Sequence, residues 1–149
     1  GGEMCYLLAY SKQNTFKAVA PIAGLTMAWM PQQYKRTRAI PLFEIHGTQD
    51  RVSEWTGDME NTGGWGAYLP VPDAVQSWAK RNGCTNETIE ELPLRYPDSH
   101  KVIVHKYSDP KKGNDVWLYE VVDGVHSWFN EDMDTANEIW KFFSKYLED

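Results

Sequence analysis

The sequence predicts an α/β fold with a mainly parallel sheet flanked by helices, whose front half is missing. Helical segments alternate along the chain with short, strongly apolar segments, as is typical of strands joined by helical crossovers. The predicted strands are too few for a complete doubly wound sheet. The first predicted helix also has no strand before it, so we expect the 149 residues to be the C-terminal part of a single domain.

The first half of the chain contains one predicted helix and two predicted strands. Residues 2–13 form the helix, because their apolar residues follow the i, i+3, i+4 spacing of one helix face. FKAVAPIAG (16–24) is a short strand that proline and glycine bring to an end. AIPLFEIHG (39–47) is a second strand, and its nearly continuous apolar character is typical of a parallel strand buried on both faces.

The second half begins with a long irregular stretch over residues 51–72, and loops of this length inside a domain are usually functional. A helix follows over 72–83, with proline at its start and Asn-Gly at its end. Residues 85–99 are predicted to be loop. KVIVHKYSD and NDVWLYEVVDG are predicted strands joined by the turn PKKG. The chain finishes with a helix over 134–149, whose N-cap is the Asp or the Thr of its first dipeptide.

The composition excludes several classes of function. A net charge of −6 and a pI of about 5.2 argue against a nucleic-acid binder, and the basic runs are short and scattered. No apolar run approaches the roughly 20 residues of a membrane span, and neither a signal peptide nor a zinc-ligand spacing is visible. Cys5 and Cys84 are either two thiols or one disulfide, and a single pair does not identify the compartment.

Two polar residues follow predicted strands and are candidates for catalysis. Asp50 lies in HGTQDRV after one strand, and His126 lies in VVDGVHSWF after the last strand. In open α/β sheets, functional groups gather at the carboxyl ends of the strands. Taken singly, Asp50 is also compatible with a turn or capping role, and His126 with a structural one. His46 is expected to be structural, with its ring bracing the first loop.

Together, Asp50 and His126 form a more specific pattern. An acid after one strand and a histidine after the last strand, followed by a C-terminal helix, match the second half of the Ser…Asp…His order of α/β-hydrolases. That order requires an upstream serine in a G-x-S-x-G turn between a strand and a helix. We therefore interpret Gly1 and Gly2 as the downstream side of this nucleophile elbow, where a strained backbone and close helix packing favour glycine.

Four stretches of the chain resemble the poly(3-hydroxybutyrate) depolymerase-like esterases, which are α/β-hydrolases that include feruloyl and acetyl-xylan esterases acting on plant cell walls. The stretches are GGEMCYLLAY, PLFEIHGTQDRV, NTGGWGAYLPVPDAVQSWAKRNGC and VDGVHSWF. They cover nearly the whole chain in the family's order. The most specific elements are His-Gly-Thr-x-Asp, the helix end W-x-x-x-N-x-C, to which WAKRNGC is similar, and Gly-x-His-x-Trp.

The resemblance implies a serine carboxylesterase that needs no metal or other cofactor. It makes Asp50 the triad acid and His126 the general base, which takes the serine proton and later passes it to the leaving alcohol. The candidate substrate-binding residues are Trp55, Trp65, Tyr68 and Trp128. The first three lie in the 51–72 loop and are also compatible with packing that loop, whereas the last either walls the site or packs beneath it.

The substrate implied by the resemblance and by the aromatic loop is an ester of a plant cell-wall polysaccharide, with a polyhydroxybutyrate-type polyester second. Such an enzyme works outside the cell or in the periplasm. Two alternatives stay open: a serine peptidase of the prolyl-oligopeptidase type, and a non-catalytic subunit or binding module. No serine of this chain lies in a G-x-S-x-G context, so we predict no triad hydrolase activity for the chain alone. We expect the missing N-terminal half or a second copy of the chain as its partner.

Overall fold

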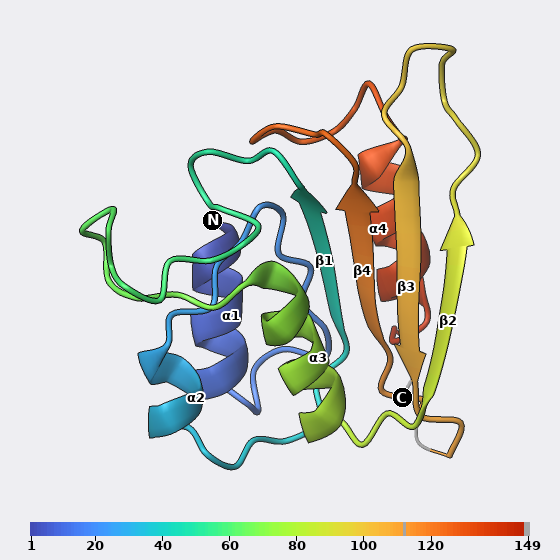
Figure 1. Cartoon of the computed structure of the whole chain (residues 1–149). Helices are drawn as coiled ribbons and strands as arrows, with labels where there is room; N and C mark the ends of the chain where they lie inside the picture. Colours follow the sequence, from blue (N-terminus) through green and yellow to red (C-terminus); the bar gives the residue numbers. More distant parts are fainter. Residues whose placement is uncertain (112, 148–149) are drawn as a thin grey trace.

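The computed structural model describes residues 1–111 and 113–147 (Figure 1). Its helices are α1 (Gly2–Ser11), α2 (Trp29–Gln33), α3 (Val71–Arg81) and α4 (Thr135–Ser144). Its strands are β1 (Leu42–Gly47), β2 (Asn86–Glu91), β3 (Val102–Ser108) and β4 (Val116–Val121). No helix in the described ranges is long and apolar enough to cross a membrane.

The three longer helices confirm the helices predicted near the start, the middle and the end of the chain. α4 begins after Asp134, whose carboxylate accepts the N–H of Asn137 at 3.2 Å, so Asp134 is the N-cap. Pro72 lies in the first turn of α3, where its missing N–H costs no hydrogen bond. Residue 112 of the predicted turn and residues 148–149 of the predicted last helix lie outside the described residues.

The strands form one mixed sheet in the order β1-β4-β3-β2. β1 and β4 are parallel, whereas β4 with β3 and β3 with β2 are antiparallel. The expected fold class, a mainly parallel sheet flanked by helices, is therefore wrong. The reason lies in the connections: a parallel neighbour needs a crossover of roughly a dozen or more residues. The links 92–101 and 109–115 are too short for one and produce hairpins.

Two segments differ from their predicted state. The predicted strand over 16–24 contributes only two isolated bridges parallel to β1, at Val19 and Ile22. Pro21 lies between them and has no N–H to continue a ladder. The predicted loop over 85–99 contains β2, all six residues of which are exposed. A strand held by its backbone pairing with β3 has no buried face, so it shows no apolar alternation in the sequence.

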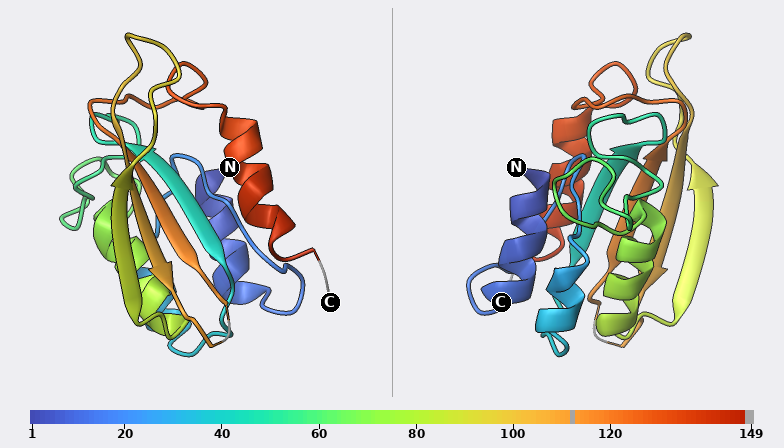
Figure 2. Two further views of the ribbon diagram at one scale, coloured as in Figure 1. Left: turned by 90° about the vertical axis from the view of Figure 1, so that its right-hand side faces the viewer. Right: turned by 60° about the vertical axis from the view of Figure 1, so that its left-hand side comes forward.

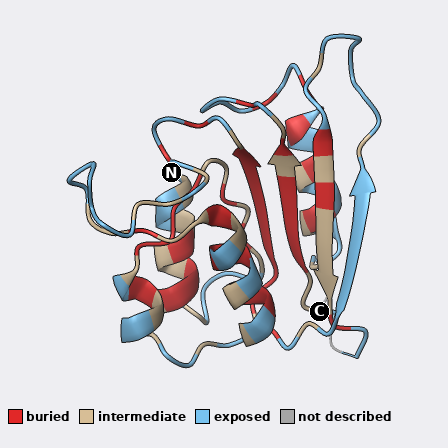
Figure 3. Cartoon of the chain, in the orientation of Figure 1, coloured by how far each residue is buried: buried red, intermediate tan, exposed pale blue. Residues whose placement is uncertain are grey.

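Two hydrophobic cores lie on the two faces of the sheet. Alternate residues of β1 serve the two sides, because successive side chains of a strand point in opposite directions. Leu42 joins Tyr10 of α1 and Trp78 of α3 in one core. Phe43 joins Phe142 of α4 in the other. Figure 2 shows α3 and α4 on opposite faces of the sheet, and Figure 3 shows the burial concentrated in β1 and β4.

The parallel pairing of β1 and β4 places their carboxyl ends at the same edge of the sheet, where Gly47 pairs with Val121. Backbone hydrogen bonds then join the two loops that follow. The N–H of Thr48 donates to the Val121 carbonyl at 3.0 Å, and the N–H of Gln49 donates to the Gly124 carbonyl at 2.9 Å. The loop that carries Asp50 and the loop that carries His126 are thus fixed against each other.

Candidate active site

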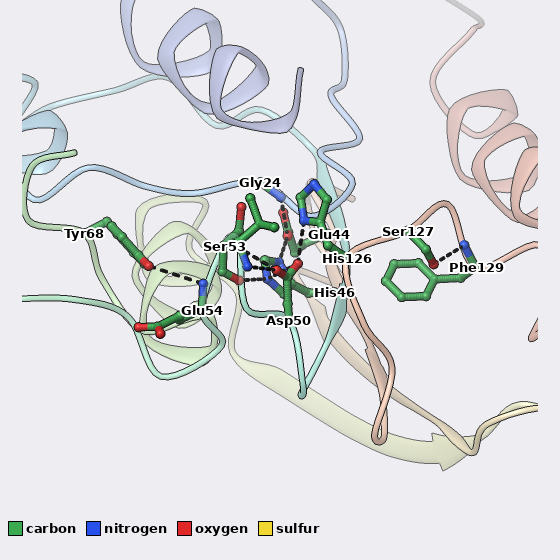
Figure 4. Close-up of polar contacts among 11 residues, drawn as sticks. Gly24, Glu44, His46, Asp50, Ser53, Glu54, Tyr68, His126, Ser127 and Phe129 are labelled. Carbon is green, nitrogen blue, oxygen red and sulfur yellow. Dashed lines mark hydrogen bonds and ion pairs between the residues drawn. The ribbon is translucent and has the colours of Figure 1, made fainter. Parts of the chain in front are cut away.

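Asp50 and His126 are in direct contact at this edge of the sheet (Figure 4). The Nδ1 atom of His126 lies 2.7 Å from Oδ2 of Asp50. The other carboxylate oxygen, Oδ1, accepts the backbone N–H groups of Val52 at 2.8 Å and Ser53 at 2.7 Å. Three donors therefore hold the Asp50 carboxylate in one orientation, and its side chain is fully buried.

The contact with Asp50 defines the proton arrangement of His126. A carboxylate can only accept, so Nδ1 carries the hydrogen and Nε2 keeps its lone pair when the ring is neutral. The His126 side chain is 43% exposed, whereas that of Asp50 is buried. A buried acid that orients a histidine whose second nitrogen is available to a substrate is the arrangement of a general base.

A further pair, Glu44 and His46, lies behind Asp50 and is completely buried. Nε2 of His46 donates to the Ser53 carbonyl at 2.7 Å and lies 3.5 Å from Oδ2 of Asp50. The bond to Ser53 braces the loop, as predicted for His46. Nδ1 lies 2.7 Å from Oε1 of Glu44, which also accepts the N–H of Gly24 at 3.1 Å.

Burial and neighbouring charges shift the pKa values of both Glu44 and His46. Burial raises the pKa of Glu44, and hydrogen bonding and charge from His46 oppose that rise. Burial lowers the pKa of His46, but hydrogen bonding and charge from Glu44, helped by Ser53 and Asp50, outweigh it and raise the pKa above its ordinary value. Sequence reasoning did not identify Glu44. The available signal was an acid two residues before a histidine in an apolar strand.

His126 lines a small pocket of about 200 Å³. Gly1 and Gly2, at the start of α1, line the same pocket, as does Trp65. A larger pocket of about 650 Å³ lies beside it and shares Val52 and Trp65 with it. Trp65 is 58% exposed and lines both pockets.

The four aromatic residues predicted to bind substrate lie in different places in the structure. Trp65 reaches the His126 pocket, and Tyr68 lines the larger pocket while its hydroxyl accepts the N–H of Glu54 at 3.3 Å. Trp55 packs against the core instead, with its ring centroid 6.1 Å from that of His46. Trp128 lines a third pocket, which does not contain His126.

The start of the chain lies at the site as well. Gly1 is the N-cap of α1, and its carbonyl accepts the N–H of Cys5 at 3.1 Å. Gly2 packs so closely on Gly24 that a Cβ atom at Gly2 would lie 2.5 Å from the Gly24 Cα. Only glycine allows this approach of the helix to the 22–24 segment.

Within the described residues, no serine hydroxyl is hydrogen-bonded to His126. The hydroxyl of Ser127, the sequence neighbour of His126, accepts the N–H of Phe129 at 3.0 Å and lies apart from the imidazole (Figure 4). The same part of the chain contains no cluster of three or more His, Cys, Asp or Glu side chains arranged to hold a metal ion. Cys5 and Cys84 are both free thiols.

Comparison with models of known protein families gives no match, and a search of curated proteins finds no significant relative.

Proposed function

We propose that Asp50 and His126 are the acid and the base of a serine-type carboxylic ester hydrolase. The observation that carries the proposal is the 2.7 Å bond between a buried carboxylate that three donors hold and a histidine whose side chain is 43% exposed and lines a pocket. Structural His–Asp pairs need no pocket at the second nitrogen. Here His126 lines a pocket that continues into a larger one.

In this mechanism, Nε2 of His126 removes the proton from a serine hydroxyl as the oxygen attacks the ester carbonyl. Asp50 holds the required tautomer and stabilises the imidazolium that forms. The imidazolium then returns the proton to the leaving alcohol, which leaves an acyl-enzyme, and the same pair activates a water molecule to hydrolyse it.

The nucleophile of the proposal is not one of this chain's serines. We place it at the pocket wall formed by Gly1 and Gly2, because that wall shares its pocket with His126. A serine on a segment preceding Gly1, or on a partner chain docked there, would meet the base. If a partner chain supplies the serine, we expect this chain to associate. Light scattering after size-exclusion chromatography tests the association, and a monomer at both low and high concentration would contradict it.

The pocket chemistry supports an uncharged ester with a flat or sugar-like group. Trp65 offers an exposed aromatic face beside His126. The larger pocket carries three acids, Glu54, Asp58 and Glu60, against Arg51. Hydrogen bonds from the N–H groups of Gly63 and Thr62 lower the pKa of Asp58 and keep it ionised. A negatively charged pocket of this kind disfavours esters with free carboxylates, which is compatible with feruloyl or acetyl sugar esters.

The test is a chain extended before Gly1 by a segment ending in Gly-X-Ser-X, compared with the same extension carrying alanine for serine. We expect hydrolysis of p-nitrophenyl acetate by the serine form, reduced by about 10³-fold or more by His126→Ala. His105→Ala, a histidine on the sheet away from the site, is the matched control and should leave the rate unchanged. Equal rates for the serine and alanine forms, with the Asp50–His126 bond intact by NMR, would contradict the proposal.

The same extended chain separates the peptidase alternative. A prolyl-oligopeptidase-type enzyme cleaves a p-nitroanilide amide as well as an ester. We expect hydrolysis of the ester alone, and His126-dependent cleavage of the amide at a comparable rate would favour the peptidase.

A further inference from the structure

The buried pair Glu44 and His46 has no part in the proposed reaction, although it touches the triad acid. The two residues are alternate members of β1, so their side chains leave the same face of the strand. All six residues of β1 are buried. A carboxyl group and an imidazole are costly to bury unless they are paired, and each supplies the other with a partner at 2.7 Å.

The hydrogen-bond partners limit where the protons of His46 lie. The Ser53 carbonyl can only accept, so Nε2 carries a hydrogen. At the other end, Oε1 of Glu44 faces Nδ1 and also accepts the N–H of Gly24. The proton between these two atoms lies either on Oε1 or on Nδ1, because a protonated carboxyl oxygen can donate to Nδ1 and still accept the N–H of Gly24. With the proton on Nδ1, Glu44 is a carboxylate and the His46 ring is an imidazolium.

We propose that Glu44 keeps His46 protonated on both ring nitrogens, and that the positive charge of His46 holds Asp50 as an ionised acceptor for His126. Glu44 and His46 are then positioning residues that act through Asp50. The kinetic consequence rests on the proposed function, whereas the charge arrangement does not depend on it.

The surroundings of His46 favour this charge state. The Glu44 carboxylate lies on one side of the ring and the Asp50 carboxylate, 3.5 Å away, on the other. An imidazole between two carboxylates is stabilised in its charged form. From α1, Tyr6 and Cys5 face Glu44; burial, and then the charge of Glu44, raise the pKa of each, so both stay neutral.

The positive charge has a predictable effect on His126, which lies on the far side of Asp50. An imidazolium at His46 offsets part of the negative charge of Asp50 that otherwise stabilises a protonated His126. Removing the charge from His46 should therefore raise the pKa of His126. A higher pKa moves the loss of the active neutral base to higher pH.

The experiment is Glu44→Gln, followed by ¹⁵N NMR of the histidine rings during a pH titration. With its amide nitrogen in the place of Oε1, Gln can donate to Nδ1 and leave His46 neutral, whereas the N–H of Gly24 loses its acceptor. We expect both His46 nitrogens to be protonated at pH 7 in the unaltered protein and Nδ1 to be unprotonated in the variant. The variant loses the negative charge of Glu44 together with the positive charge of His46, and because His46 is the one that faces Asp50, the pKa of His126 should still rise.

The matched control is Glu120→Gln. Glu120 forms the same kind of pair with His105, at 2.9 Å, on β4 and β3 away from the site. Its removal should leave the His126 titration unchanged. A merely structural role for Glu44 would give the same unchanged titration as the control.

A neutral His46 at pH 7 in the unaltered protein would overturn the proposal, and so would a folded Glu44→Gln variant with an unshifted His126. If that variant does not fold, the protonation of the two His46 nitrogens in the unaltered protein, measured by ¹⁵N NMR at pH 7, decides the proposal alone. If His126 shifts as expected but the serine-extended chain hydrolyses no ester, the charge arrangement stands and the proposed function falls.

Discussion

Replacement of Gly47 by alanine tests whether the loops that carry Asp50 and His126 depend on a backbone-to-backbone contact. Gly47 ends β1 and lies against Gly124 in the loop after β4. A Cβ atom at Gly47 would lie 2.5 Å from the Gly124 carbonyl carbon and 2.9 Å from the Val125 carbonyl oxygen. Carbon atoms in contact are normally about 3.5–4.0 Å apart. The loops must therefore separate by about 1 Å, because no flexible side chain is there to move instead.

This displacement acts directly on the site. Asp50 lies three residues after Gly47, and His126 lies two residues after Gly124. Opening the loops by about 1 Å stretches the 2.7 Å bond between them beyond the roughly 3.2 Å limit of a hydrogen bond. Overpacking costs about 1–3 kcal/mol, and the lost charge-assisted bond costs about 1.5–3 kcal/mol. We expect Gly47→Ala to lower the free energy of unfolding by about 3–5 kcal/mol in urea titrations.

The control is Gly63→Ala in the exposed loop, where the nearest atom to a new Cβ is an Asp58 carboxylate oxygen at 3.3 Å. Its effect on stability should stay within about 1 kcal/mol. The downfield proton resonance of the His126 Nδ1–H group should vanish in Gly47→Ala and persist in the control. Wild-type stability together with an intact resonance in Gly47→Ala would refute the reasoning.

Three further predictions follow from the same geometry. In Asp50→Asn the amide oxygen keeps the two backbone N–H groups, so its NH₂ group donates to His126 and moves the ring proton to Nε2; the tautomer is visible by ¹⁵N NMR, and activity of the serine-extended chain should fall by about 10⁴-fold. Burial, then the charges of two nearby aspartates, raises the pKa of Cys84 to about 11, so iodoacetamide at pH 8 should alkylate it at least about tenfold more slowly than free cysteine; an equal rate would count against its burial. The raised pKa of His46 means that its protonation stabilises the fold fully below about pH 6.5, and that this contribution is lost as the pH rises through the pKa of the folded state. His46→Gln should abolish that part of the pH dependence of the free energy of unfolding. An unchanged pH profile would show that the protonation of His46 is not coupled to folding.

Much of the fold could be predicted because local patterns decide it. α3 and α4 have periodic apolar faces and clear end signals, and β1 and β4 are mostly apolar segments. The sheet topology was mispredicted because pairing depends on contacts between distant segments. β2 is the clearest example: its sequence, NETIEE, has no buried face, and only its pairing with β3 makes it a strand.

The candidate site, too, could be predicted only in part from the sequence. The rule that functional groups follow strand ends singles out Asp50 and His126 as candidates, and the parallel pairing of β1 with β4 brings their loops together. The place of Trp128 could not be predicted. The loop that carries it has positive φ angles at Asp123 and Phe129, which are unusual for residues other than glycine and leave no mark in the apolar pattern. The side on which Trp128 leaves that loop depends on those angles.

The contact between Glu44 and His46 can be predicted from the sequence by a rule about buried strands. A strand buried on both faces should contain apolar residues, so a carboxyl group within it needs a charged partner on its own face. Period-two spacing points to the residue two positions away, which here is His46. An acid and a histidine spaced in this way, just before the acid of a candidate catalytic pair, therefore predict a buried ionic contact behind the site. The sequence contains that information, although only the distances show that Asp50 joins the network.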